Sequence, residues 1–394
     1  MKQYRYLIIG GGMTADAAAK AIHQMDPQGS IGIFSAESDP PYSRPSLSKG
    51  LWKGKPMERI WRKTEATGAD LHLNCSISAL DIKTKSVQDH SGQIYSYEKL
   101  LLATGGSPRR LPFGDVPVNY FRDLNDYRSL RLAAESGAKI AVIGGGYIGS
   151  ELAAAISMVG NPPTMVFPEK GIGARLFPLD LSLYLNDFYR GKGITVLDGE
   201  LVISLEKDGN EVNLTTDCGT VLTVDYVVAG LGITPNVDLA VMANLKLDHG
   251  IVVDDHLRTS NPDIFAAGDV ASFYNNTLHK WMNVEHEENA LWMGQIAGKN
   301  MAGADEKYQH LPLFYSDLFE IGFEGVGEVD SRMDIVSDWQ EPYRKGVLYY
   351  LKDQKLRGVL LWDVWKMADT ARALIAEPGQ FTKEELIGKI PFDS

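Results

Sequence analysis

Two glycine clusters carry the clearest chemical signal in the sequence. Both follow an apolar run and share one spacing, which is glycine, any residue, glycine, two residues, then glycine or alanine: Gly10, Gly12 and Ala15, and later Gly144, Gly146 and Gly149. Such a turn lets the backbone approach a pyrophosphate, and the N-terminus of the following helix faces the same negative charge. One copy alone could be a tight packing of strand against helix. Two copies predict two dinucleotide sites.

An acidic residue lies at the expected distance beyond each cluster. Glu37 follows Ala15 by 22 residues, and Glu169 follows Gly149 by 20 residues. A carboxylate at this place accepts hydrogen bonds from ribose hydroxyls. Glu169 should therefore favour NADH, because a carboxylate repels the 2′-phosphate of NADPH. Arg175 is close enough in sequence to reach such a phosphate.

These residues need strands that deliver them and helices that hold them. Residues 4–22 and 138–156 each predict an apolar strand, a glycine turn and an alanine-rich helix. Further apolar runs that end near glycine or glutamate predict buried parallel strands: 31–37, 99–106, 163–169, 225–232 and 263–270. After about residue 311 the sequence alternates apolar and polar residues, and "KDQK" at 352–355 predicts a hairpin turn. The fold class is therefore α/β, with a separate α+β domain at the C-terminal end.

Composition narrows the class of protein. With 394 residues, 44% of them apolar and 23% charged, the chain predicts a globular protein of two or three domains. A net charge of −12 argues against nucleic acid and anionic membranes as partners. We find neither an apolar run of 18 residues nor a secretory signal pattern, so no transmembrane segment is expected. A cytoplasmic location is expected, or an organelle if a targeting segment precedes this sequence.

The two cysteines do not predict redox chemistry of their own. Cys75 and Cys218 are far apart in sequence, and neither has a CxxC or CxxxxC partner. We expect no disulfide and no dithiol centre, and each thiol is expected to be a small buried apolar group. No metal site is predicted either.

A stiff basic stretch follows the second predicted strand. In "PPYSRPSLSKGLW", residues 40–52, Pro41 and Pro45 fix their own backbone angles and hold Arg44 out of the helical region. Taken alone, the stretch could be a surface connection with solvated charges. It could equally line a bound ligand.

Two further stretches decide between these readings. "LLLATGGSPR" and "TSNPDIFAAGDV" resemble signatures of the two-dinucleotide-binding flavoprotein superfamily over residues 1 to about 310. The resemblance implies a glutathione-reductase-like fold with two Rossmann-like domains, the first holding FAD and the inserted one NAD(H). It implies an FAD-binding domain at 1–122 and 251–310, an NAD-binding domain at 123–250 and the C-terminal α+β domain at 311–394.

The basic stretch is similar to one found in two branches of this superfamily. These are the apoptosis-inducing factor-like proteins and the ferredoxin reductases that serve oxygenases. "FPEKG", "VEH", "LFYSDL" and the tail around "KGVLYYLKDQKLRGVLLWDV" resemble the first branch, so the likeness covers nearly the whole chain. The chain is short between Trp52 and Cys75, lacks a long insertion between Asp338 and Gly346, and carries Tyr315 where the animal proteins have tryptophan. These departures argue against a death-related or redox-gated role.

The resemblance implies a set of site residues. FAD would be bound by Gly10, Gly12, Met13, Thr14, Ala15, Glu37, Arg44, Lys49, Ile77, Thr104, Gly105, Arg122, Asp269, His286, Glu287 and Tyr315. NAD(H) would be bound by Gly144, Gly146, Tyr147, Ile148, Gly149, Glu151, Glu169, Arg175, Gly232, Glu285 and Glu324. Lys49 and Glu151 resemble a charge pair beside flavin N5, and Tyr147 resembles an aromatic gate over the flavin. Ordinary helix charges remain the alternative for Glu151, and a solvated helix cap for Glu285 and His286.

The function implied is that of an NADH-dependent FAD oxidoreductase. Hydride would pass from NADH to the flavin, and electrons would leave to an acceptor that the sequence does not name: a quinone, oxygen or a small redox protein. One alternative is a ferredoxin or rubredoxin reductase, although a net charge of −12 opposes acidic partners. Another is an NADH-sensing interaction protein with slow turnover. The resemblance also allows a homodimer.

Overall fold

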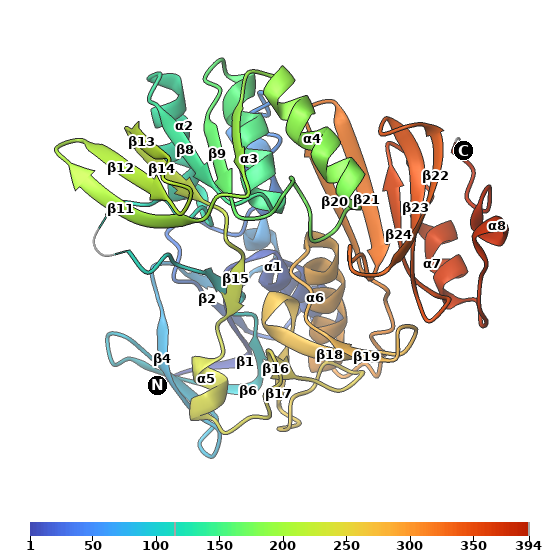
Figure 1. The fold of residues 1–394 in the computed structure, drawn as a ribbon. Helices are drawn as coiled ribbons and strands as arrows, with labels where there is room; N and C mark the ends of the chain where they lie inside the picture. Colours follow the sequence, from blue (N-terminus) through green and yellow to red (C-terminus); the bar gives the residue numbers. More distant parts are fainter. Residues whose placement is uncertain (114–115, 393–394) are drawn as a thin grey trace. The chain divides into compact units, whose positions relative to one another are not determined.

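A computed structural model of the chain describes residues 1–113 and 116–392 (Figure 1). The chain forms two compact units: unit 1 comprises Met1–Arg44, Pro56–Ser107 and Thr234–Pro312, and unit 2 comprises Pro45–Lys55, Pro108–Ile233 and Leu313–Ser394. The chain passes from unit 1 to unit 2 within β7 (Gly106–Pro108) and returns within β15 (Ile233–Pro235). The division into three domains stays a prediction, and positions 114–115 and 393–394 of those domains lie outside the described residues.

Unit 1 is built on one mixed sheet. β1 (Lys2–Ile9) lies parallel between β2 (Ile31–Phe34) and β6 (Ile94–Leu102). The remaining strands extend the sheet: β3 (Asp70–His72) beyond β2, β17 (Ile264–Ala266) and β5 (Ser86–Asp89) beside β6, and β4 (Ile77–Asp81) beyond β5. Strands β2 and β17 and the C-terminal ends of β1 and β6 are apolar and buried, as parallel strands covered on both faces must be.

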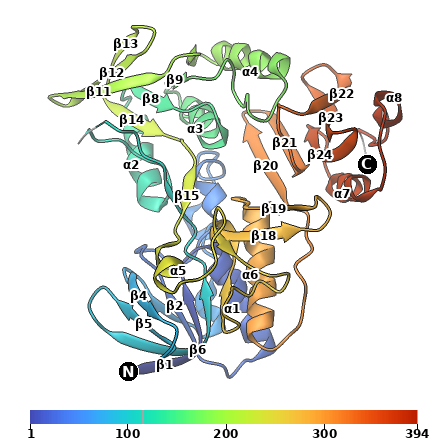
Figure 2. The same ribbon diagram turned by 60° about the horizontal axis from the view of Figure 1, so that its bottom comes forward.

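Two helices of unit 1 lie side by side in both views (Figures 1 and 2). They are α1 (Met13–Met25) and α6 (Glu287–Met301). Glycines on α6 permit their close approach, because a Cβ at Gly294 would lie 2.4 Å from the carbonyl oxygen of Thr14, and one at Gly298 2.4 Å from that of Ala18. Shorter elements complete the unit: α5 (Asp238–Met242), β16 (Ile251–Val252), β18 (Ala271–Asn275) and β19 (Lys280–Met282).

Unit 2 contains the second strand–glycine–helix arrangement. Its four-stranded sheet is parallel throughout and runs β10 (Thr195–Asp198), β9 (Thr164–Phe167), β8 (Ile140–Ile143), β14 (Tyr226–Ala229). The helices of this region are α2 (Leu124–Glu135), α3 (Tyr147–Met158) and α4 (Leu179–Gly191). A small antiparallel sheet consists of β11 (Val202–Asp208), β12 (Glu211–Thr216) and β13 (Val221–Val224). The strands and helices predicted around both glycine clusters are thus confirmed.

The C-terminal part of unit 2 is an antiparallel sheet with two short helices. Its strands run in the order β20 (Leu313–Leu318), β21 (Ile321–Gly327), β24 (Lys355–Trp362), β23 (Lys345–Lys352), β22 (Asp334–Glu341). The helices are α7 (Ala368–Ala376) and α8 (Lys383–Leu386). Lys352 pairs with Lys355 at the end of β23 and β24, which confirms the predicted hairpin.

The cysteines differ from the expectation of two buried apolar groups. Both are free thiols, but Cys218 is exposed in the turn between β12 and β13, and Cys75 is only half-buried. The Cys75 thiol donates to Asp89 Oδ2 at 3.6 Å, and burial together with this carboxylate raises its pKa. A turn position exposes Cys218 whatever its side chain. Among the described residues, no helix is long and apolar enough to cross a membrane.

Candidate dinucleotide and redox site

The first glycine loop, in unit 1, has the shape that a phosphate needs. Gly10 has φ +122°, and a Cβ there would lie 2.0 Å from the carbonyl oxygen of Ala103, so only glycine fits. Gly12 is the N-cap of α1 and offers no side-chain cap. A Cβ on Gly12 would meet no atom of the described residues within 4 Å. The glycine therefore leaves room beside the N-terminus of α1, which suits a pyrophosphate.

Three charged residues predicted to bind FAD converge in unit 1. Arg44 Nη2 donates to Glu37 Oε1 at 2.6 Å, and the Tyr42 hydroxyl donates to Glu37 Oε2 at 2.6 Å. Burial lowers the pKa of Arg44, but the electrostatic interactions with Tyr42, Glu37 and Asp269 outweigh it, and the net pKa is raised. Arg44 thus lies within electrostatic reach of Asp269. The role of Tyr42 was not recognised from the sequence, because a tyrosine in a proline-rich loop carries no motif.

The other turns of unit 1 are held by contacts between distant segments. A Cβ on Gly268 would lie 2.4 Å from Thr14 Oγ1, so the turn that carries Asp269 packs against the first turn of α1. Thr104 Oγ1 donates to the carbonyl oxygen of Asn236 at 2.7 Å, and Asn236 Nδ2 donates to the carbonyl oxygen of Thr104 at 2.9 Å. Asn236 was also missed, since 132 residues separate it from Thr104.

The second glycine loop, in unit 2, repeats the geometry of the first. Gly144 has φ +115°, and a Cβ there would lie 2.6 Å from the carbonyl oxygen of Gly230. A Cβ on Gly149 would lie 1.9 Å from the carbonyl oxygen of Gly144, so helix and turn touch directly. Gly146, the N-cap of α3, again faces open space. The third glycine of the motif is thus required for packing, and the second for access.

Glu169 is held by the arginine that the sequence placed near it. Arg175 Nη2 lies 2.9 Å from Glu169 Oε1, and Arg175 Nε donates to the same oxygen at 3.0 Å. Ser331 supports this loop, since its hydroxyl donates to the carbonyl oxygen of Ala174 at 2.6 Å. Arg175 is 82% exposed, so it can leave Glu169 without disturbing the fold.

Lys49 and Glu151 are in direct contact within unit 2. Lys49 Nζ lies 2.6 Å from Glu151 Oε1, and the Glu151 side chain is only 3% exposed. The hydroxyl of Ser48 donates to Glu151 Oε2 at 2.6 Å, and the hydroxyl of Ser316 donates to Oε1 at 2.5 Å. Lys49 Nζ also lies 5.1 Å from the centre of the Tyr315 ring, a cation–π distance. Neither serine was identified from the sequence.

The loop that carries Lys49 is fastened to unit 2 at further points. Trp52 is 5% exposed, and its ring packs edge-on against Tyr127 of α2 and lies under the Arg131 guanidinium. Lys53 Nζ lies 3.2 Å from Asp317 Oδ2 of β20. Residues 45–55 therefore belong to unit 2 and are held there by several side-chain contacts.

Tyr147, the predicted gate, belongs to an aromatic cluster. Its ring meets Phe314 edge-on at 5.3 Å and lies tilted at 6.4 Å from Phe323. Burial, with smaller contributions from Tyr350 and Glu151, raises the pKa of Tyr147 well above its ordinary value. The phenol therefore stays neutral at ordinary pH, and its role as a gate stays a prediction.

The remaining predicted residues divide between the units. In unit 1, Met13 and Thr14 are the first residues of α1, and Ile77 is the first residue of β4. Gly105 follows β6 and has φ +61°. Glu285, His286 and Glu287 lie at the start of α6, where His286 is the N-cap. In unit 2, Ile148 is in the first turn of α3, Gly232 has φ +79°, Arg122 precedes α2, and Glu324 pairs with Tyr315 across β21 and β20. Of the predicted FAD residues, Lys49, Arg122 and Tyr315 thus belong to unit 2. The binding roles of all these residues stay predictions.

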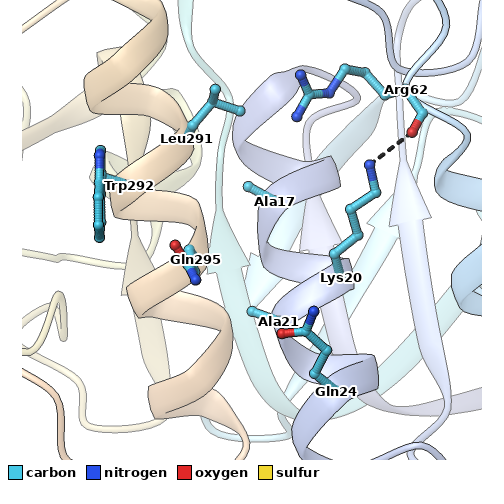
Figure 3. Close-up of a pocket in the computed structure, with 8 residues that line it drawn as sticks. All are labelled: Ala17, Lys20, Ala21, Gln24, Arg62, Leu291, Trp292 and Gln295. Carbon is cyan, nitrogen blue, oxygen red and sulfur yellow. Dashed lines mark hydrogen bonds between the residues drawn. The ribbon is translucent and has the colours of Figure 1, made fainter.

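A shallow surface groove of unit 1 involves none of the predicted residues. Its volume is about 240 Å³, and it runs between α1 and α6 (Figure 3). Lys20 and Arg62 lie on one side, and Trp292 and Gln295 of α6 on the other. Both cations contact the buried carboxylate of Asp16, which compensates one of their two positive charges within the fold.

Comparison with known proteins places the chain in a family. Residues 4–294 match the family described as pyridine nucleotide-disulphide oxidoreductase. The chain belongs to this family. Residues 297–342 and 337–377 match the C-terminal domain of mitochondrion-associated apoptosis-inducing factor. Both the superfamily and the branch expected from the motifs are thus confirmed, together with the α/β fold class.

Curated relatives match the chain nearly from end to end. Mitochondrial apoptosis-inducing factor 1 of Dictyostelium discoideum is 33% identical over 95% of this chain and 79% of its own length. Monodehydroascorbate reductase 3 of Arabidopsis thaliana is 32% identical over 91% of this chain and 89% of its own length.

Solved structures extend the likeness. A putidaredoxin reductase in covalent complex with putidaredoxin is 27% identical, with a TM-score of 0.89 over 95% of this chain and 94% of that one. A ferredoxin reductase of Rhodopseudomonas palustris is 27% identical, with a TM-score of 0.87 over 96% of each chain.

Membership of this family establishes the class of reaction. The chain is an FAD-dependent oxidoreductase that uses NADH, and its cofactors are FAD and NAD(H). The helix N-termini at Gly12 and Gly146 fit two dinucleotides, because neither glycine places a side chain where a pyrophosphate would lie and each leaves room for one Cβ.

Proposed function

We propose that the chain is an NADH-dependent flavoprotein reductase whose flavin passes electrons directly to an acceptor outside the chain. The buried Lys49–Glu151 pair carries the proposal. Bound FAD would supply the hydride-accepting chemistry, and Lys49 would supply a fixed positive charge for the negative charge that arrives with the hydride. Glu151 would hold that ammonium in place at 2.6 Å.

The cysteines support a direct route out of the flavin. Cys218 is exposed in a hairpin turn, and the Cys75 thiol donates a hydrogen bond to Asp89. Neither can form the adjacent dithiol that a disulfide-reducing member of the family would use. The acceptor is therefore a species other than a protein-bound disulfide.

The relatives suggest the class of acceptor. One of them is a monodehydroascorbate reductase, and a structural neighbour is a reductase bound to putidaredoxin. We infer that this chain also delivers single electrons, either to a small redox protein or to an organic acceptor such as a quinone. NADH is the preferred donor in this proposal, because the spacing of Glu169 from the second glycine loop predicts that its carboxylate accepts the ribose hydroxyls.

Acceptor screening on the reduced protein tests the proposal. The purified protein is reduced with one equivalent of NADH without oxygen and then mixed with an iron–sulfur protein, a quinone or oxygen. Reoxidation by the iron–sulfur protein or the quinone at least tenfold faster than by oxygen is expected. Reoxidation by a disulfide substrate alone would contradict the proposal. A reduced form that persists with every acceptor, together with a change of oligomeric state, would favour an NADH sensor.

A further inference from the structure

The carboxylate of Glu151 is surrounded by donors on both oxygens. Oε1 accepts from Lys49 Nζ and from the Ser316 hydroxyl, and Oε2 accepts from the Ser48 hydroxyl. The three donors come from two segments far from α3 in sequence: the loop 45–55 and strand β20. The 3% exposure of the Glu151 side chain means that water contributes little. Almost all stabilisation of this charge therefore comes from these groups.

Lys49 already balances the negative charge of Glu151, so the two serine hydroxyls are not needed to neutralise the carboxylate. A carboxylate turns easily about its last side-chain bond, because that torsion has a broad minimum. A single contact from Lys49 would leave the two oxygens free to exchange places. Ser48 and Ser316 hold one oxygen each and so fix the plane of the carboxylate.

The orientation of the Glu151 carboxylate in turn determines where the Lys49 ammonium lies. Lys49 has a flexible side chain, and its Nζ rests between Glu151 Oε1 and the Tyr315 ring. Ser316 is the neighbour of Tyr315 in β20, and Ser48 is the neighbour of Lys49 in the loop. One strand and one loop thus supply both the ring and the donors that define where the ammonium lies.

We propose that Ser48 and Ser316 are positioning residues that act through Glu151 to aim the Lys49 ammonium. The inference rests on the function proposed above. Neutral hydroxyl donors satisfy the buried carboxylate without adding charge, so the positive charge of Lys49 stays available to the redox site. Loss of either hydroxyl lets the carboxylate turn, and Lys49 then follows it.

Flavin reduction in serine variants tests this proposal. Ser316→Ala and Ser48→Ala, each purified with bound FAD, should be reduced by NADH about tenfold more slowly, which corresponds to ~1.4 kcal/mol. The absorbance maximum of the oxidised flavin should also shift before any NADH is added. Ser48→Thr keeps a hydroxyl and should restore both values.

A second buried serine of unit 2 provides the matched control. Ser182 is fully buried on α4, and its hydroxyl has no hydrogen-bond partner within the described part of the chain. Ser182→Ala removes a buried hydroxyl of the same kind, and it should leave rate and spectrum unchanged.

A double-mutant cycle separates positioning from a merely structural role. If Ser316 acts through Glu151, then Ser316→Ala should change neither rate nor spectrum once Glu151 is already alanine. Full and multiplicative effects of Ser316→Ala in that background would overturn the proposal, as would a wild-type rate and spectrum in both single variants. If Ser316→Ala fails to fold, the same cycle with Ser48→Ala decides the matter. A wild type that holds FAD but is not reduced by NADH would overturn only the proposed function, because the spectral cycle still tests the serines.

Discussion

The charged side chains of the candidate site depend on the contacts that the fold gives them. Glu151 and Lys49 lie 102 residues apart, yet their charged atoms are 2.6 Å from each other and sheltered from water. An ammonium fixed in this way does not need to reorganise when charge arrives nearby, which is why such groups contribute strongly to rate. Glu169 is held less firmly than Glu151, since its partner Arg175 is 82% exposed and can move away from it.

Lys49→Ala is expected to slow reduction of the flavin by NADH by about 10²–10³-fold while FAD stays bound. Glu151→Ala should slow it less and should shift the flavin absorbance, because an unpaired ammonium is then free to approach the ring. Stopped-flow reduction of both FAD-loaded variants checks this. Rates within about threefold of the wild type would show that the pair has no part in the reaction.

Glu169→Ala is expected to remove the preference for NADH. The carboxylate accepts ribose hydroxyls and repels a 2′-phosphate, and without it Arg175 is left to attract that phosphate. The ratio of kcat/KM for NADH and NADPH should therefore fall in the variant. Equal use of both coenzymes by the wild type would contradict this assignment.

Elements of the structure were predictable where the signal is local. Both strand–glycine–helix units, and the hairpin at 352–355, follow from residues adjacent in sequence. The supports of the site could not be read in the same way. Ser316 and Asn236 bond to residues more than 100 positions away, and a serine or an asparagine alone carries no pattern. The role of Ser316 becomes visible only once β20 is placed against α3, and that of Asn236 only once its backbone lies beside Thr104.

The two glycine loops allow a paired test at the level of the element. Gly12 and Gly146 both face open space, so a side chain there should leave the fold intact and obstruct only a ligand. Gly12→Val is expected to yield a colourless protein without FAD, whereas Gly146→Val should keep FAD but bind NADH weakly. Absorbance spectra and NADH titration measure the two effects. A yellow Gly12→Val protein would mean that FAD lies elsewhere.

The packing of α1 on α6 gives a stability prediction. A Cβ at Gly298 would lie 2.4 Å from the carbonyl oxygen of Ala18, so Gly298→Ala should force the helices apart. We expect a loss of about 1–3 kcal/mol in the free energy of unfolding. Gly191→Ala is the control, because its Cβ would meet nothing within 4 Å. Urea unfolding of both variants checks the prediction, and equal midpoints would contradict it.

At the scale of the whole molecule, the chain divides differently from its sequence motifs. The resemblance implies a discontinuous FAD-binding domain at 1–122 and 251–310, an inserted NAD-binding domain and a C-terminal domain. The contacts gather the chain into two units, with residues 45–55 in unit 2. Sequence adjacency could not show this, because the loop is assigned by contacts with α2, α3 and β20. The cysteine environments were missed for a similar reason, since exposure is a property of the finished fold.

The thiols should be dispensable for the whole reaction. The variant with both Cys75→Ser and Cys218→Ser is expected to oxidise NADH at the wild-type rate, because no route from the flavin passes through sulfur. Steady-state NADH oxidation with an added quinone measures this. Loss of activity in a folded, FAD-loaded variant would reveal a thiol centre.

The boundary between Arg44 and Pro45 also sets a rule for building hybrids of this protein with its relatives. A transplant of residues 108–233 alone would bring a foreign Glu151 opposite the native Lys49, and the two would not have been selected together. Exchanging 45–55, 108–233 and 313–392 as one set keeps lysine, serines and glutamate from a single parent. In such a chimera residues 45–55 must come from the same parent as the rest of unit 2, although they precede the rest of that unit in the sequence.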